Sequence, residues 1–181
     1  MELGESLLAA AREAFFSQKD LADRAIAQLS DAQLRQPLAG DANSIAIVMK
    51  HIAGNLTSRW TSFLTSDGEK PTRDRDGEFV DSFTSRAEML AVWDRGWACV
   101  DSTLSTLRPA DLQARVTVRG ESLAVPFAIQ RSLAHISYHV GQIVLIARIH
   151  AGPAWRTLTI APGGSRQYNR DHWGPIGAPP S

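Results

Sequence analysis

The sequence has only one cysteine, Cys99, among its 181 residues. A single cysteine cannot form an intrachain disulfide, so the chain does not belong to the disulfide-stapled class of small secreted proteins. Cys99 lies within a helical apolar pattern, two residues after Trp97. We therefore expect a buried packing residue, and the alternative is a reactive thiol.

The sequence also lacks an excess of charge of either sign. Lys and Arg together number 19, Asp and Glu together also number 19, and the calculated pI is about 7.0. A protein that binds nucleic acid or an anionic membrane through its charge needs a basic patch, and no block of like charge occurs here. We expect neither nucleic acid nor a membrane as a partner.

Long apolar runs are missing as well. Lys, Arg, His or Gln interrupts each apolar stretch well before the roughly 20 residues that cross a bilayer. Glu2 and Glu5 lie where a signal peptide would carry positive charge. These features predict a cytoplasmic protein.

Four segments place apolar residues at the spacing of amphipathic helices, namely residues 2–29, 44–65, 85–107 and 126–152. Ser85 and Glu88 have capping-box spacing at the start of the third segment, and Pro126 suits the first turn of the fourth. Trp60, Trp93 and Trp97 occur at helical spacing among aliphatic residues, which indicates core or dimer contacts.

The remaining segments are shorter or irregular. Residues 116–118 and 122–125 predict a small β-hairpin around Arg119 and Gly120, and residues 66–83 form a long polar loop. The charged part of this loop, from Arg73 to Glu78, is expected to be a solvated surface, although it follows the second helix and could border a pocket. With 44% hydrophobic residues, the chain fits one all-α domain over residues 1–152. Residues 153–181 are expected to be an irregular tail that packs on the bundle or on a dimer partner.

Two of the five histidines, His135 and His139, lie four residues apart in the fourth predicted helix. This spacing places both side chains on one helix face, about 6 Å apart along the axis, so both can reach a single metal ion. Such a pair is also common as ordinary core or surface histidines. His51, in the second predicted helix, lies between apolar residues and is expected to face inward.

Two short segments carry a resemblance to a known family. Residues 135–142 (HISYHVGQ) and residues 50–55 (KHIAGN) resemble the corresponding segments of the DinB-like (YfiT-like) superfamily of metalloproteins. The order of the predicted elements from the first helix to about His150 also resembles this family. The resemblance implies a four-helix bundle of up-down-down-up topology and a homodimer.

The resemblance further implies that His51, His135 and His139 are the protein ligands of a divalent metal ion, zinc or nickel. Three neutral imidazoles leave the charge of the ion uncompensated, so a remaining position would favour water, a thiolate or a carboxylate. Asn55 and Gln142 could accept the distal N–H groups of these histidines, and Gln142 could equally serve helix packing. His150 fits a helix C-terminus better than a ligand set, and His172 lies in the tail.

Three functions remain open at this point. The first is a metal-dependent enzyme, a thiol-S-transferase or a hydrolase, acting on a small molecule with water or a low-molecular-weight thiol as the nucleophile. The resemblance covers bacterial thiol transferases, thiol-dependent isomerases and hydrolases alike. The second is a stress-associated metal-binding protein or structural homodimer without catalysis, in which His172 or a carboxylate closes the metal site. The third is a metal-free helical interaction module.

Overall fold

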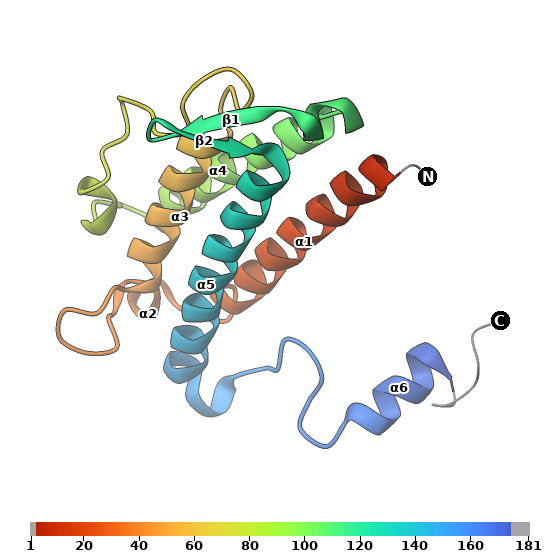
Figure 1. The fold of residues 1–181 in the computed structure, drawn as a ribbon. Coiled ribbons are helices and arrows are strands. Elements are labelled where there is room, and N and C mark those ends of the chain that lie inside the picture. Colours follow the sequence, from red (N-terminus) through yellow and green to blue (C-terminus); the bar gives the residue numbers. More distant parts are fainter. Residues whose placement is uncertain (1–2, 175–181) are drawn as a thin grey trace.

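The structure is a computed structural model that describes residues 3–174. Its fold is all-α with one small β-hairpin, as the sequence predicted (Figure 1). The elements, in chain order, are α1 (Leu3–Ile26), α2 (Asp31–Arg35), α3 (Ile45–Trp60), η1 (Gly77–Phe79), α4 (Arg86–Thr106), η2 (Pro109–Gln113), β1 (Arg115–Val118), β2 (Glu121–Ala124), α5 (Val125–Ala151), η3 (Gly152–Ala154) and α6 (Ser165–Trp173).

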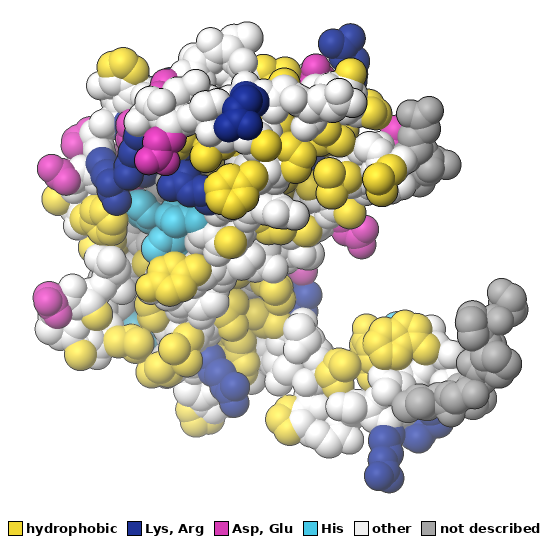
Figure 2. All heavy atoms as spheres, viewed as in Figure 1, with side chains coloured by type: hydrophobic (Ala, Val, Ile, Leu, Met, Phe, Trp, Pro, Cys, Tyr) yellow, Lys and Arg dark blue, Asp and Glu magenta, His cyan; other side chains and the backbone are white. Residues whose placement is uncertain are grey.

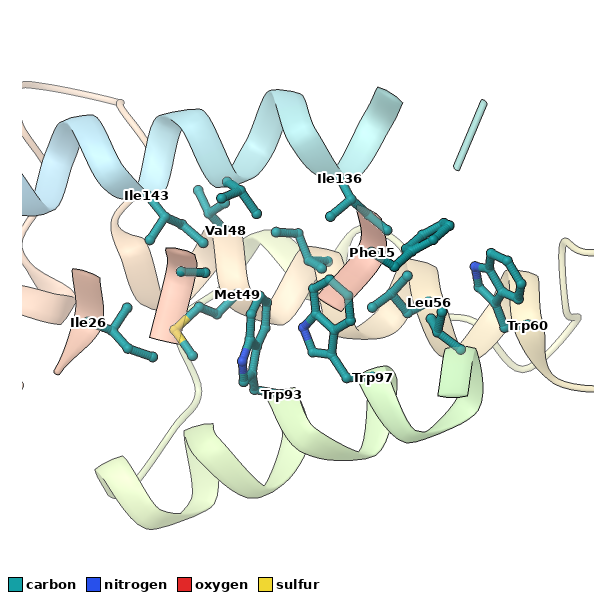
Figure 3. Close-up of a cluster of buried hydrophobic side chains, with 14 of the residues drawn as sticks. Phe15, Ile26, Val48, Met49, Leu56, Trp60, Trp93, Trp97, Ile136 and Ile143 are labelled. Carbon is teal, nitrogen blue, oxygen red and sulfur yellow. The ribbon is translucent and has the colours of Figure 1, made fainter. Parts of the chain in front are cut away.

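Four long helices, α1, α3, α4 and α5, pack around one apolar core. The closest pairs are α3 with α4 and α1 with α5, and α3 also contacts α5. Figure 3 shows Phe15, Trp93 and Trp97 among the side chains that fill the space between these helices, and all three are almost completely buried. Trp60 is also buried, so the three tryptophans at helical spacing are core residues. The Trp93 ring nitrogen donates a hydrogen bond of 2.8 Å to Asp23, which satisfies its polar edge.

Serine side chains cap two of the long helices. Ser44 accepts a hydrogen bond from the backbone N–H of Ile47 at the start of α3, and Ser85 accepts one from Glu88 at the start of α4. The capping box predicted at Ser85 is only half formed, because the carboxylate of Glu88 accepts from Thr84 instead. Both helices begin within one residue of the predicted position.

Several predicted boundaries differ from the structure. The second predicted helix was expected to reach residue 65, but α3 ends at Trp60, and Ser62 has a positive φ of 50°. The first was expected to run over residues 2–29, but α1 ends at Ile26, and the chain then enters the short helix α2, which the sequence analysis missed. The start predicted at Glu2 lies outside the described residues.

The tail predicted as irregular over residues 153–181 contains the nine-residue helix α6. Before α6, Leu158 is buried and Trp155 is half-buried against the core. Helix α6 itself stands away from the four long helices (Figure 1), and none of its residues is buried. Residues 175–181 of the predicted tail lie outside the described part of the chain.

The long loop after α3 is fixed to the hairpin. The hairpin turn has positive φ at Arg119 and Gly120, as a tight two-residue turn between antiparallel strands requires. Both backbone N–H groups of this turn donate to the carboxylate of Asp67 at 2.8 Å. The loop therefore folds back along α3 toward the hairpin and α5. Over the described residues, no helix combines the length and apolar character that crossing a membrane requires.

Candidate metal centre

The structure brings His51 from α3 together with His135 and His139 from α5. One ring nitrogen of each histidine lies within 4.8 Å of the corresponding nitrogens of the other two. The Nε2 atoms of His51 and His135 are 3.4 Å apart. Within residues 3–174, His51, His135 and His139 are the potential ligands that lie close enough together to hold a metal ion. Figure 2 shows histidine side chains reaching the surface on the same face as a group of Lys and Arg side chains.

The proton of His51 is positioned by Glu78. Nδ1 of His51 lies 2.9 Å from a carboxylate oxygen of Glu78, and both side chains are buried. Because an ionised carboxylate only accepts hydrogen bonds, Nδ1 carries a proton, and in the neutral ring Nε2 then keeps its lone pair. This is the arrangement that a metal-binding histidine needs.

Glu78 is in turn held by Arg73. The Arg73 guanidinium donates two hydrogen bonds of 2.8 Å to Glu78, and its side chain is only 4% exposed. Burial alone would raise the pKa of Glu78, but the hydrogen bonds from Arg73 and His51 lower it below its ordinary value. The carboxylate therefore stays ionised at neutral pH. For Arg73 and Glu78, the expectation of a solvated surface is wrong, since the loop turns both side chains inward.

His139 has a neutral partner. Its Nδ1 lies 2.8 Å from the side-chain oxygen of Gln142, one turn later on α5. Since a carbonyl oxygen accepts, Nδ1 of His139 donates and Nε2 keeps its lone pair. Gln142 thus contacts the histidine group, which is compatible with the first of the two roles considered for it.

The environment keeps the two α5 histidines neutral. Burial, together with the neighbouring rings of His139 and His51, lowers the pKa of His135 to about 4. Burial also lowers the pKa of His139, against the opposing effect of the hydrogen bond to Gln142. A histidine must be deprotonated to bind a metal, so both rings are in the competent form at neutral pH.

The donor set fits a first-row divalent ion. Ligand atoms that all lie within 4.8 Å of one another lie within about 2.8 Å of one point, which is about 0.7 Å longer than the Zn–N distance of about 2.0–2.1 Å. The 3.4 Å between the Nε2 atoms of His51 and His135 is close to the edge of about 3.3 Å that a tetrahedron with such bonds has. Imidazole nitrogens suit zinc, nickel, copper and iron alike. Ring nitrogens more than roughly 4 Å from any common point would favour the metal-free alternative, and the nitrogens of these three histidines lie closer than that.

A cavity of about 180 Å³ lies beside the histidines, and His51 and His135 form part of its wall. The rest of the wall comes from α3, α5, the long loop and the hairpin. It comprises Asn55, Arg59, Trp60, Phe63, Arg73, Arg75, Val118, Arg119, Leu123, Ala128, Arg131 and Ser132. A small molecule in this cavity would lie next to the potential ligands.

The other residues considered from the sequence lie elsewhere. Asn55 is buried in the cavity wall, and Glu78 rather than Asn55 accepts the His51 proton. The ring of His150 bonds the backbone oxygen of Gln36 near the end of α5. His172 bonds the backbone oxygen of Tyr168 within α6.

Glu78 and Arg73 were missed as site residues because their burial depends on how a long loop folds. One signal in the sequence pointed toward them. Gly54 lies three residues after His51 inside α3. Glycine inside a helix lowers its stability, so its presence there indicates a packing or functional reason. In the structure, a Cβ at this position would collide with the Glu78 carboxyl group. Gly54 thus provides the space in which Glu78 reaches His51.

Comparison with known proteins gave one result. A family model described as "Protein of unknown function (DUF1572)" matches residues 2–164. No curated protein and no solved structure matches the chain. The matched segment includes the three histidines, the loop that carries Glu78 and every residue that lines the cavity. The chain therefore belongs to the DUF1572 family.

Proposed function

We propose that this protein is a divalent-metal-dependent enzyme, a thiol-S-transferase or hydrolase that acts on a small molecule. The observation that carries the proposal is the convergence of three imidazoles next to a cavity. Three protein ligands with access to a cavity are typical of catalytic zinc sites, whereas structural sites are usually closed by a fourth protein ligand. Zinc and nickel are the ions that we propose.

The residues of the chain have distinct parts in this function. When bound, a divalent ion supplies Lewis acidity, which lowers the pKa of a water or thiol nucleophile toward neutrality. His51, His135 and His139 would hold the ion, and Glu78 and Gln142 hold two of these rings in the tautomer that leaves Nε2 free. The apolar part of the cavity wall would limit the access of bulk water to the substrate.

We also propose membership of the DinB-like superfamily, with its up-down-down-up bundle and a homodimeric assembly. The support is the resemblance of the histidine-bearing segments to that superfamily and the four long helices around one core. Helix α5 exposes Tyr138, Leu145 and Ile149, each more than half accessible. Large apolar side chains gathered on one helix are typical of a surface that binds a partner.

Metal analysis tests the proposal. The protein, purified and then reconstituted with Zn²⁺ or Ni²⁺, should retain about one ion per chain after removal of free metal. His135→Ala should lose this ion, whereas His150→Ala, on the same helix but outside the histidine group, should keep it. The loaded protein is then screened for thiol transfer to small electrophiles and for hydrolysis.

The outcomes separate the candidates. An unchanged metal content in His135→Ala, or no stoichiometric ion in the wild type, would overturn the metal site. A bound ion whose removal lowers the melting temperature but which supports no turnover would favour the non-catalytic metal-binding homodimer.

A further inference from the structure

The cavity beside the histidines is strongly basic. Five of its wall residues are arginines, namely Arg59, Arg73, Arg75, Arg119 and Arg131. At about 180 Å³ the cavity is smaller than the about 300–1,000 Å³ typical of sites for drug-sized ligands, so its ligand is small. A wall with this charge attracts anions and repels cations.

Two carboxylates neutralise part of this charge. Glu78 is bound by Arg73, as described above. Glu69 accepts hydrogen bonds from Arg59 at 2.9 Å and from Arg119 at 2.8 Å. These interactions engage three of the five guanidinium groups within the protein. An excess of positive charge remains even before a metal ion is counted.

Arg75 and Arg131 supply the remaining charge. Neither side chain has a hydrogen bond or an ion pair with any of residues 3–174, although both border the cavity. Arg131 lies one helical turn before His135 on α5, so the two side chains share a helix face about 6 Å apart along the axis. A guanidinium with free donors, aimed at a cavity, is suited to bind carboxylate or phosphate oxygens in a bidentate manner.

Another part of the wall is apolar. It is formed by Trp60, Phe63, Val118, Leu123 and Ala128. The Trp60 ring nitrogen already donates to the hydroxyl of Ser132 at 3.0 Å, so the ring offers the cavity apolar surface rather than a free donor. A ligand that satisfies both parts of the wall has an apolar body and an anionic group.

We propose that the substrate of this site is a small organic anion. Its carboxylate or phosphate group binds Arg131 and Arg75, its apolar body packs on Trp60 and Phe63, and its reactive atom faces His51 and His135. The inference rests on the proposed function for the statement that this ligand is the substrate. The anion site itself belongs to the cavity and does not require the metal.

Isothermal titration calorimetry tests the anion site on metal-free protein, which excludes coordination of the probe by a metal ion. The probes are 3-phenylpropionate and phenyl phosphate, with neutral 3-phenylpropionamide as the matched control. We expect one or both anions to bind at least about 10-fold more tightly than the amide, the ratio that one charge-assisted hydrogen bond provides. The tighter of the two anions identifies the anionic group.

Variants assign the binding to the arginines. Arg131→Gln should weaken anion binding about 10-fold, and the double variant Arg131→Gln/Arg75→Gln should weaken it further. Arg148→Gln is the control, since Arg148 lies on α5 about 25 Å from Arg131 along the helix axis and outside the cavity. Equal binding of anions and amide, no binding of either anion, or no loss in the double variant would overturn the proposal.

A parallel titration with zinc and nickel separates this proposal from the proposed function. Arginine-dependent anion binding in a protein that holds neither zinc nor nickel would support the anion site and contradict the metal-dependent enzyme. Normal zinc binding, together with anion binding that is as tight in Arg131→Gln/Arg75→Gln as in the wild type, would overturn only the anion site.

Discussion

Glu78 determines which nitrogen of His51 is free to bind a metal, because its carboxylate fixes the proton on Nδ1. In Glu78→Gln the side chain keeps its shape, but the negative charge is lost and Arg73 is left buried without its main partner. We expect zinc affinity to fall by about 10–100-fold, as is usual for the loss of a partner behind a ligand. Competition with a chromophoric chelator measures this change.

Asp76→Asn is the matched control for Glu78→Gln. Asp76 lies two residues earlier in the same loop, is exposed, and its side chain has no hydrogen bond or ion pair within residues 3–174. The zinc affinity of Asp76→Asn should equal that of the wild type. Equal affinities in both variants would show that Glu78 does not act through His51.

Glu69 gives the site a pH dependence of its own. Burial alone would raise its pKa, but the hydrogen bonds from Arg119 and Arg59 lower it from 4.5 to about 2. As the pH falls from 4.5 to 2, the unfolded chain takes up a proton that the folded chain does not, so the free energy of unfolding decreases over this window.

Glu69→Gln should therefore destabilise the protein by roughly 1 kcal/mol at pH 7, the upper range for a partly exposed ion pair. The difference from the wild type should shrink as the pH falls below 4.5. Urea unfolding at pH 7, 5 and 3.5 measures it. Glu121→Gln, exposed and unpaired among the described residues, should change the unfolding free energy by less than about 0.5 kcal/mol at pH 7. A pH-independent difference in Glu69→Gln would contradict the explanation.

The residues of the site differ in how far the sequence could predict them. His135 and His139 are set by local spacing on one helix, and His51 by an inward apolar pattern together with the resemblance. Glu78 is fixed by none of these, because its position depends on a loop that joins α3 to α4. A polar loop carries no periodicity, so the sequence alone favours solvent exposure for its charged residues.

At the scale of elements, the contact between α3 and α4 depends on Gly96. A Cβ at this position would lie 2.8 Å from Cα and 2.9 Å from the backbone oxygen of Ala53, two residues after His51. Gly96→Ala must push the helices apart, and we expect a loss of about 1–3 kcal/mol in the free energy of unfolding. Chemical denaturation measures this loss.

Gly141 is the matched control, because it also lies inside a long helix but a Cβ there would meet nothing within 4 Å. Gly141→Ala should stabilise the protein by about 0.5–1 kcal/mol, since alanine has the higher helix propensity. We expect the free energy of unfolding to fall in Gly96→Ala and to rise in Gly141→Ala. A loss at both positions would mean that helix α5 is packed against a partner at Gly141.

Element types were easier to predict than element ends. The apolar periodicity of the four long helices and the strand formers beside Arg119 and Gly120 define those elements locally. By contrast, α3 stops at Trp60 although Phe63 and Leu64 continue its apolar pattern. Phe63 stacks on Trp60 from the following turn, with ring centroids 5.0 Å apart, so an apolar pattern can extend past the end of a helix.

On the scale of the whole molecule, the cavity is a product of distant segments. Helices α3 and α5, the loop after α3 and the hairpin all contribute to its wall. Asp67 joins two of these segments by accepting from the backbone of the hairpin turn. Such contacts between residues about 50 positions apart have no signature in local sequence, which explains why the histidines were predicted and the basic cavity was not.

The C-terminal segment allows a test of where the folded body ends. Helix α6 has no buried residue, whereas Leu158 is buried and the backbone of Arg156 forms hydrogen bonds of 2.7 and 3.1 Å with Gln28. A chain that ends at residue 164 should melt within about 2 °C of the full-length protein, because exposed residues contribute little to stability. A chain that ends at residue 152 also loses Leu158 and should lose about 2–4 kcal/mol, or roughly 4–15 °C in melting temperature. Differential scanning calorimetry of the three chains at two protein concentrations measures both effects. A large loss in the chain that ends at 164, which becomes smaller on dilution because only the full-length protein is stabilised by dimerisation, would instead show that α6 binds a second copy of the protein.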